Sequence, residues 1–257
     1  MIEKLHTARW FLERPAFWRH GAELGLGKLR TNRDTPELAR RARAWAEERA
    51  VSVARALGVV ELLAPGVPVP QFTPSLLEEG SRLAERSAVR MGGPGDLNLL
   101  YAAVQLSGAR RIVETGVAYG WSSLAILAAL EGSTAGRLVS VDMPYPKMNN
   151  ESFVGIVVPE RLRGAWEIVR EPDRNGLDKA IGRHGGTIDL CHYDSDKSWW
   201  GRKYGYRLLW DALASGGVFI SDDIQDNLAF AEFVEAHGLA FAVTAFEGKY
   251  VGIVRKP

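Results

Sequence analysis

From Arg110 to the C-terminus, short apolar runs alternate with segments of helical periodicity. This alternation predicts repeated strand–helix units, which build one mostly parallel sheet with helices against its faces. We expect strands at residues 111–115, 137–141, 166–170, 188–193 and 217–221. Helices are expected between them, at residues 121–131, 159–163, 176–183, 199–214 and 227–237.

The last two apolar runs, 240–246 and 250–255, are separated only by Glu247, Gly248 and Lys249. A connection this short joins antiparallel strands. The sequence therefore predicts an α/β fold, in which a Rossmann-like, mostly parallel sheet of seven strands ends in an antiparallel C-terminal hairpin.

Residues 1–90 carry mainly helical signals. Thr35-Pro36 and Thr73-Pro74 each combine a capping threonine with proline at the first helical position. The helix that starts at Pro36 is expected to continue to Gly58. We predict a helical lid or dimerisation region at 1–90, through which the chain can form a homo-oligomer, and a catalytic domain at 91–257.

The charge balance excludes some partners. Lys and Arg number 32 against 31 Asp and Glu, for a net charge of +1, so no long-range field favours nucleic acid or an anionic membrane. No apolar stretch reaches the ~20 residues of a membrane helix, and the N-terminus lacks an apolar leader. Cys191 has no second cysteine to pair with. We therefore expect a cytoplasmic protein with a small-molecule ligand.

A glycine-containing turn follows the first expected strand, in a segment that reads RIVETGVAYGWSS from residue 111 to 123. Gly116 and Gly120 allow the backbone to approach a ligand closely, at the sheet edge where open α/β folds bind ligands. The dinucleotide fingerprint G-x-G-x-x-G is incomplete, because Ala118 stands where it needs a glycine. Glu114 would repel a pyrophosphate and suits a cationic ligand. Both features count against a nicotinamide cofactor.

The second expected strand ends at Asp142, whose carboxylate can accept hydrogen bonds from ribose hydroxyls. Together with the glycine turn, this pattern resembles the class I S-adenosylmethionine-dependent methyltransferases over roughly residues 91–257. The resemblance implies S-adenosylmethionine as cofactor. It implies cofactor contacts from Glu114, Gly116, Tyr119, Gly120, Ser122, Asp142, Met143 and Asp194. The alternative is that the glycines only form a tight turn and that Asp142 caps a loop.

Acidic residues follow the fourth and fifth expected strands, as Asp194 and Asp196 in one segment and Asp222-Asp223 in the other. Because parallel strands end at the same edge, these carboxylates are expected to converge, and a hard cation such as Mg²⁺ would stabilise them. We predict a metal site formed by Asp194, Asp222 and Asp223. The alternative assigns these residues to loops and to a helix cap.

The acidic pattern resembles two kinds of metal-dependent O-methyltransferase. The catechol type has an Asp, a Lys three residues later and an Asp-Asn pair, matched here by Asp194, Lys197 and Asp222-Asp223 except for the final Asn. The macrocin and novobiocin type has Asp-x-Asp, matched by Asp194 and Asp196. The resemblance implies methyl transfer to a hydroxyl of a sugar or secondary metabolite.

The two resemblances imply different catalytic bases. The catechol type implies Lys197, whose pKa a metal and a sulfonium would lower, and the sugar type implies Asp196, which we prefer. His192 is a third candidate, or else a buried strand histidine.

Four aromatic residues follow the acidic segment: Trp199, Trp200, Tyr204 and Tyr206. They are expected to pack helices, or one of them to line the acceptor site.

The rival functions are an NAD-dependent oxidoreductase on a similar fold and a non-catalytic binding protein.

Overall fold

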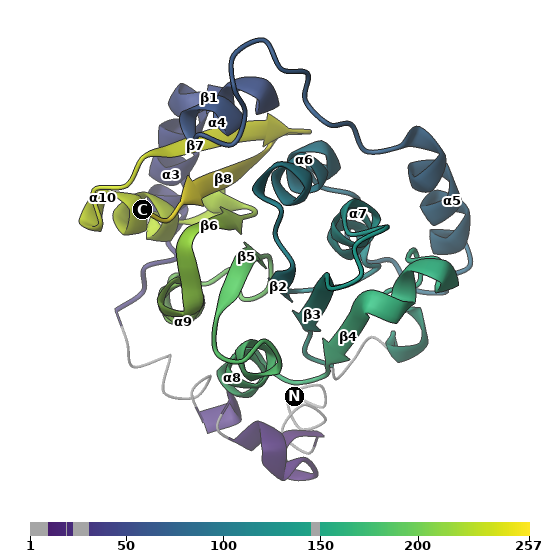
Figure 1. Ribbon diagram of the computed structural model, residues 1–257. Coiled ribbons are helices and arrows are strands. Elements are labelled where there is room, and N and C mark those ends of the chain that lie inside the picture. The colour runs from purple at the N-terminus through teal and green to yellow at the C-terminus, as the bar shows by residue number, and fades with distance from the viewer. Residues whose placement is uncertain (1–9, 19, 23–30, 145–149) are drawn as a thin grey trace.

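The computed structural model describes residues 10–18, 20–22, 31–144 and 150–257. These residues form a central sheet of eight strands with helices around it (Figure 1). The strands are β1 (Ala50–Val51), β2 (Arg111–Thr115), β3 (Arg137–Val141), β4 (Trp166–Val169), β5 (Ile188–Tyr193), β6 (Leu213–Ser221), β7 (Phe241–Phe246) and β8 (Lys249–Arg255). Their order across the sheet is β1-β7-β8-β6-β5-β2-β3-β4. β8 runs antiparallel to its neighbours β6 and β7, and the other pairs are parallel. The predicted fold class is confirmed, with one strand more than expected.

Helices cover both faces of the sheet (Figure 1). The α-helices are α3 (Pro36–Arg49), α4 (Val53–Val59), α5 (Pro74–Ala84), α6 (Leu97–Ser107), α7 (Trp121–Ala129), α8 (Asp173–Arg183), α9 (Trp199–Ala212) and α10 (Ala229–Ala236). The 3₁₀ helices are η1 (Pro15–Phe17), η2 (Glu151–Phe153), η3 (Glu160–Ala165) and η4 (Ile224–Asp226). The helix predicted at 159–163 is thus the 3₁₀ helix η3.

Two apolar cores lie on opposite sides of the sheet. One packs α4, α6 and α7 against the strands, and the other packs α3, α8, α9 and α10. Side chains alternate along each strand, so that Ile112 of β2 faces the first core and Val113 the second. A strand that is buried on both faces has a continuous run of apolar residues, and such runs are the pattern from which these strands were predicted.

The extra strand comes from the N-terminal region. The helix predicted to continue to Gly58 ends at Arg49, residues 50–51 pair in parallel with β7, and the side chain of Ser52 caps α4. A serine cap and the unpaired backbone groups at a sheet edge outweigh the helical periodicity here. The 1–90 region therefore contributes both a strand and core residues, although residues 1–9, 19 and 23–30 lie outside the described part of the chain.

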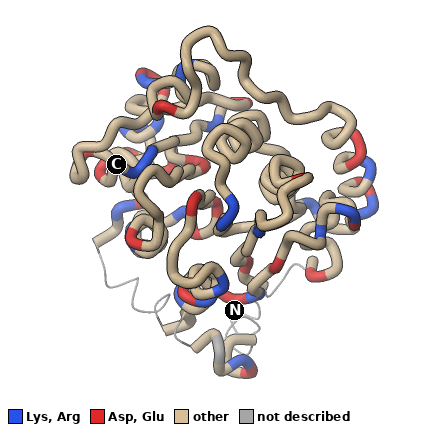
Figure 2. The backbone as a smooth tube through the Cα atoms, viewed as in Figure 1, with Lys and Arg blue, Asp and Glu red and all other residues tan. Residues whose placement is uncertain are grey.

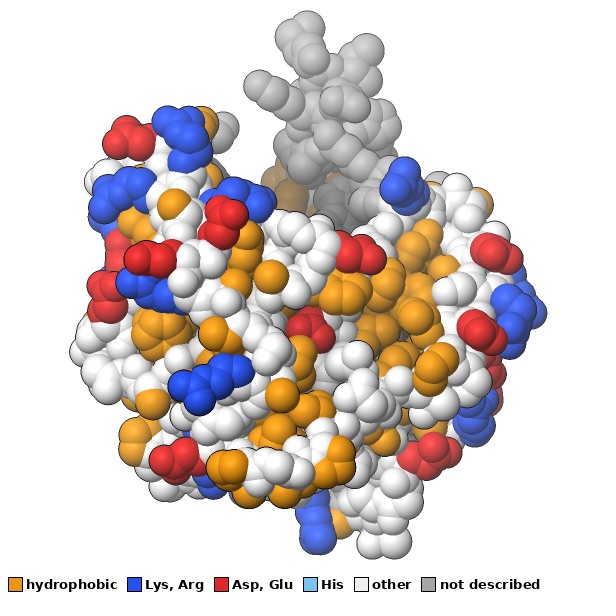
Figure 3. Space-filling view, turned by 90° about the horizontal axis from the view of Figure 1, so that it is seen from above, with side chains coloured by type: hydrophobic (Ala, Val, Ile, Leu, Met, Phe, Trp, Pro, Cys, Tyr) orange, Lys and Arg blue, Asp and Glu red, His pale blue; other side chains and the backbone are white. Residues whose placement is uncertain are grey.

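Charges of both signs are interspersed along the chain (Figure 2), and apolar side chains lie among them on the face shown in Figure 3. The face in Figure 3 carries both signs, in agreement with the net charge of +1. None of the described helices has the length and apolar character that a bilayer crossing requires.

Candidate active site

Four neighbouring strands end at the same level of the sheet. The register pairs Thr115 with both Val141 and Tyr193, and Tyr193 with Ser221. The residues that follow these ends lie side by side along one edge: Gly116, Asp142, Asp194 and Asp222. The glycine turn therefore lies beside acidic residues at this edge, and of the four carboxylates expected to converge, Asp194, Asp222 and Asp223 do so whereas Asp196 does not.

Gly116 is required by close contact as well as by its backbone conformation. Its φ is +81°, and a Cβ at this position would lie 2.3 Å from the carbonyl oxygen of Asp194. Any larger residue would push the loop after β5 away from the turn after β2. Gly116 thus sets how closely these two segments approach.

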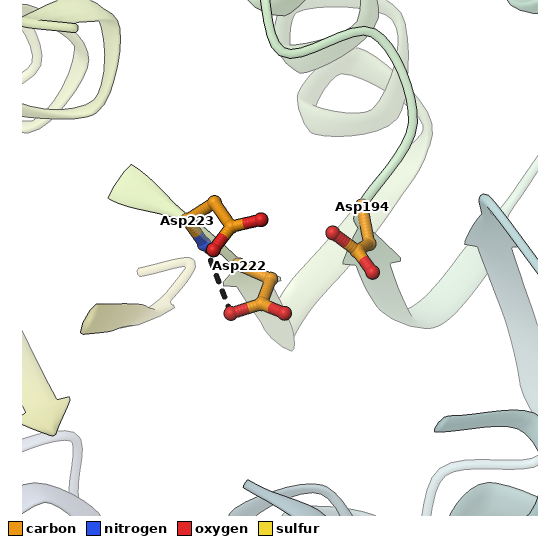
Figure 4. A group of neighbouring side chains, drawn as sticks. All are labelled: Asp194, Asp222 and Asp223. Atoms are coloured by element: carbon orange, nitrogen blue, oxygen red, sulfur yellow. Dashed lines mark hydrogen bonds between the residues drawn. The ribbon is translucent and has the colours of Figure 1, made fainter. Parts of the chain in front are cut away.

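Three carboxylates form a cluster beyond β5 and β6 (Figure 4). Asp194, Asp222 and Asp223 each offer a ligand atom, and these atoms lie within 4.8 Å of one another. The backbone N–H of Asp223 donates to Oδ1 of Asp222 at 2.9 Å. The helix η4 that follows has no side-chain cap, so Asp222 does not serve as the helix cap of the alternative interpretation. Burial and repulsion by Asp194 and Asp223 raise the pKa of Asp222. Oxygen donors gathered at this spacing fit a hard divalent cation.

Two lysines lie beside this cluster. The Lys197 ammonium pairs with Asp194 and lies 2.8 Å from Oδ2 of Asp223, and Lys249 at the start of β8 lies 3.6 Å from Oδ1 of Asp223. Burial raises the pKa of Asp223, but these ammonium groups lower it to about 2. Burial lowers the pKa of Lys197, but Asp194 and Asp223 outweigh burial and raise it. The neighbouring anions therefore favour the ammonium form of Lys197.

His192 forms a buried pair with Glu114. Its side chain is 3% exposed, and Nδ1 lies 3.6 Å from Oε1 of Glu114. Neither atom has another hydrogen-bond partner, whereas Oε2 of Glu114 accepts from Ser123 and Ser140. Burial lowers the pKa of His192, but Glu114 and Asp194 outweigh it and raise the pKa.

A cavity of about 200 Å³, which we call the carboxylate cavity, opens over the cluster. It is lined by the three carboxylates together with His192, Lys197, Lys249, Ser122, Trp121, Val117, Ala118, Leu100, Val251 and the 92–96 segment without Pro94. A Cβ at Gly92 or Gly93 would meet no atom within 4 Å, whereas a Cβ at Gly95 would lie 3.4 Å from Oδ2 of Asp222. The segment before α6 therefore forms one wall of this cavity.

A second cavity of about 260 Å³, which we call the Asp142 cavity, lies on the other side of the same two loops. Gly116 and Asp196 line it, whereas Val117 and Asp194 line the carboxylate cavity. Met143 and Asp173 lie in its wall beside Asp142.

Three acids line the Asp142 cavity, and burial raises the pKa of two of them. Asp142 accepts from the Val117 N–H at 2.9 Å and pairs with Arg170, yet burial raises its pKa. Burial likewise raises the pKa of Asp173 to about 6, although Ser195 donates to it at 2.5 Å. Two acceptor groups in one strand-end cavity suit a ligand that presents hydroxyl or amino donors.

Three of the residues predicted to contact a cofactor line neither cavity: Glu114, Tyr119 and Gly120. Glu114 is fully buried with its serine partners and His192. The Tyr119 hydroxyl donates to the carbonyl of Val89. Gly120 packs against Gly155, whose Cα would lie 3.0 Å from a Cβ at position 120. These three residues therefore pack around the turn outside the cavities. The other predicted contacts line the cavities: Gly116, Ser122, Asp142, Met143 and Asp194.

Asp196, preferred as the base, lies away from the carboxylate cluster. It is exposed, its Oδ1 accepts from the Ser198 N–H at 3.0 Å, and it packs against Gly201 in the first turn of α9. In the loop that leads to α9, Asp196 lines the Asp142 cavity instead.

The four aromatic residues after the acidic segment line a third cavity, about 580 Å³ between α9 and α10, and of the four only Tyr204 also reaches the Asp142 cavity.

Sequence reasoning missed several site residues. Asp142 comes directly after β3, whereas Asp173 begins α8 after a short connection from β4, so the strand-end signal marks Asp173 less clearly. Lys249 and the 92–96 segment carry no such signal, because the fold brings them to the site from distant parts of the chain.

Solved structures share this fold. An O-methyltransferase from Bacillus cereus in complex with SAH aligns with a TM-score of 0.58 and 19% identity, covering 80% of this chain and 100% of its own. The O-methyltransferase TomG from Streptomyces achromogenes, involved in tomaymycin synthesis and in complex with SAM, aligns at 0.55 and 17%, covering 82% and 99%. An SAH-bound methyltransferase from Podospora anserina aligns at 0.53 and 14%, covering 87% and 97%. The fold is that of the class I methyltransferases.

Residues 113–224 match a family described as a methyltransferase domain. This stretch runs from β2 to η4 and contains the glycine turn, Asp142 and the carboxylate cluster. The match and the shared fold together indicate a methyltransferase domain in this part of the chain. No curated protein matches the chain at a significant level.

Proposed function

We propose that this protein transfers a methyl group from S-adenosylmethionine to a hydroxyl oxygen of a small molecule, assisted by a divalent cation. The observation that carries the proposal is the cluster of Asp194, Asp222 and Asp223 in a cavity next to the Asp142 cavity. Structural neighbours described as O-methyltransferases support oxygen as the acceptor atom. A sugar or secondary metabolite is the proposed acceptor class.

The Asp142 cavity is the proposed site of the nucleoside. Asp142 would accept hydrogen bonds from the ribose hydroxyls, and Met143 would pack beside the adenine. Asp173 would accept from a donor on the same ligand. The cofactor supplies a methyl group on a sulfonium, which the adjoining turn at 116–118 would direct toward the carboxylate cavity.

The carboxylate cavity is the proposed site of the acceptor. Asp194, Asp222 and Asp223 would hold the cation, which lowers the pKa of a hydroxyl placed against it. Lys197, as an ammonium between Asp194 and Asp223, balances the excess negative charge. Methyl transfer needs mainly alignment, so residues that hold both reactants close together supply much of the rate enhancement.

His192 is the proposed proton acceptor because of its position. It lines the carboxylate cavity, whereas Asp196 lines the other cavity and Lys197 is held by two carboxylates. With Nδ1 beside Glu114, the second ring nitrogen is left for the acceptor proton. Glu114 would orient the imidazole.

Thermal shift separates the proposed function from its rivals. A ligand that binds only the folded state raises the melting temperature. We expect a rise with S-adenosylhomocysteine and none with NAD. A rise with NAD alone would favour the oxidoreductase, and no rise with either would favour the non-catalytic alternative.

Labelled methyl transfer tests the chemistry. With S-adenosylmethionine and a panel of sugar, phenol and catechol acceptors, we expect O-methyl products that disappear after EDTA treatment and return with Mg²⁺. His192→Gln should lower kcat by about 100-fold or more and leave S-adenosylhomocysteine affinity unchanged. Full turnover after exhaustive chelation would contradict the cation, and parent-like turnover of His192→Gln would contradict the base.

Self-association through the N-terminal helices stays a prediction, and light scattering of the whole chain checks it.

A further inference from the structure

Arg202 is the largest fully buried side chain of the described residues, and it carries a charge. Its guanidinium has no carboxylate within normal hydrogen-bond distance, since the nearest described acid, Asp226, lies 3.8 Å away and is itself 41% exposed. Removing a cation from water without a close anionic partner is costly. The hydrogen bonds of the guanidinium must therefore offset the cost of burying it.

Those hydrogen bonds reach the two loops that carry the carboxylate cluster. Nη2 donates to the backbone carbonyl of Asp223 at 2.8 Å, and Nε donates to the backbone carbonyl of Lys197 at 3.3 Å. The first carbonyl belongs to the loop after β6 and the second to the loop after β5. One planar group therefore bridges the backbones of two segments whose side chains are also linked by the ion pairs of Lys197.

The bridged backbone is in an unusual conformation at one end. Asp223 has a φ of +51°, a region that residues other than glycine rarely adopt. The carbonyl that Arg202 binds belongs to this same residue, so the guanidinium stabilises a backbone geometry that is unfavourable by itself.

Further buried contacts fix the guanidinium. Nη1 donates to the Tyr206 hydroxyl at 3.3 Å, and that hydroxyl lies 2.6 Å from Oγ of Ser221, the last residue of β6. Asn227 donates to the same Lys197 carbonyl at 2.8 Å. Arg202 is thus held from α9 and from the end of β6 together.

We propose that Arg202 is a positioning residue that sets the separation of Asp194 from Asp222 and Asp223 and thereby the affinity of the cluster for a divalent cation. It does not line the carboxylate cavity, so it acts through the two carbonyls. The inference rests on the proposed cation site.

Manganese binding provides the test, measured by electron paramagnetic resonance and calorimetry with S-adenosylhomocysteine binding followed in parallel. Arg202→Met is expected to weaken Mn²⁺ binding by roughly 10- to 100-fold, the range for residues that support metal ligands from behind. Cofactor-product binding should change less than twofold. Arg202→Lys keeps the charge but cannot span both carbonyls, so an intermediate loss is expected, and this variant decides the question if Arg202→Met does not fold.

Two variants on the same helix serve as controls. Arg207→Met removes an exposed arginine and should leave both affinities unchanged. Leu209→Ala removes a fully buried side chain and should lower the melting temperature without weakening Mn²⁺ binding, which separates positioning from general stability. Parent-like Mn²⁺ affinity in both Arg202 variants, or an equal loss in Leu209→Ala, would overturn the inference. Absence of Mn²⁺ binding in the parent would instead refute the cation site on which it rests.

Discussion

At the scale of single residues, the site depends on acids whose burial conflicts with their charge. Asp142, Asp173 and Asp222 all have raised pKa values with burial as the largest cause. Each is kept in place by local hydrogen bonds or by a neighbouring cation. Burial of these acids therefore costs stability, and acids whose pKa values are shifted in this way are concentrated at functional sites.

Asp142→Asn tests the nucleoside site. The loss of charge-assisted hydrogen bonds to ribose hydroxyls should weaken S-adenosylhomocysteine binding by about 10- to 100-fold. Calorimetry measures the affinity. Glu151→Gln is the matched control, because Glu151 is the other partner of Arg170 but lines neither cavity. Equal affinities of parent and Asp142→Asn would refute the ribose assignment.

Asp173→Asn tests the raised pKa. Because the pKa is about 6 in the folded state and 3.8 is the ordinary value, the folded chain holds this proton more tightly. The free energy of unfolding should therefore fall as the pH rises from 4 to above 6, and the neutral asparagine should remove this loss. We expect a difference of about 1 to 2 kcal/mol at neutral pH, given the partial exposure of the side chain.

Urea unfolding of the ligand-free protein across this pH range gives the measurement. Asp178→Asn, an exposed change on the same helix, should retain the parental pH dependence. A parental profile in Asp173→Asn would show that Asp173 titrates normally.

At the scale of elements, the site is formed where loops approach one another. The turn after β2 contacts the loop after β5 through Gly116, and α9 connects that loop to the one after β6 through Arg202. The sheet register sets the level of these loops. The loops set the distances between the functional groups.

Gly116→Ala is expected to push the two loops apart. A left-handed alanine costs about 1 to 2 kcal/mol, and contact with the Asp194 carbonyl adds to this cost. Mn²⁺ and S-adenosylhomocysteine should both bind more weakly, as measured by calorimetry. Gly132→Ala shares a φ of +83° but meets no atom within 4 Å, so it should lose stability and keep both affinities. Unchanged affinities in Gly116→Ala would show that the loop contact is dispensable.

At the scale of the whole molecule, the N-terminal region is part of the central fold. β1 extends the sheet, and Leu57 of α4 is fully buried in the core that α6 and α7 form. Burial of this kind couples the region to the strands that carry the site.

Leu57→Ala tests this coupling. Loss of a fully buried leucine should lower the free energy of unfolding by about 2 to 5 kcal/mol, in one transition that includes the methyltransferase sheet. Leu77→Ala, at a position that is 37% exposed, should have a small effect. Calorimetric melting distinguishes the outcomes. A separate early transition, with the rest of the chain melting as in the parent, would show that residues 1–90 fold as an independent unit.

The sequence alone determined the alternation of strands and helices, because buried parallel strands must be apolar and their connections must be helical. It also predicted the convergence of Asp194, Asp222 and Asp223, which follow the ends of β5 and β6, although Asp196, expected in the same group, lines the other cavity. Such features depend on residues close together in the chain, so the sequence contains the information that predicts them.

Only the tertiary structure decided the direction in which each group points. Asp196 and Asp194 are two residues apart in the loop between β5 and α9 but line different cavities. Lys249, Asp96 and Arg202 reach the site from separate elements, and residues 50–51 form a strand only because β7 offers an edge. These outcomes depend on contacts between residues far apart in the chain, and no local pattern of residues records such contacts.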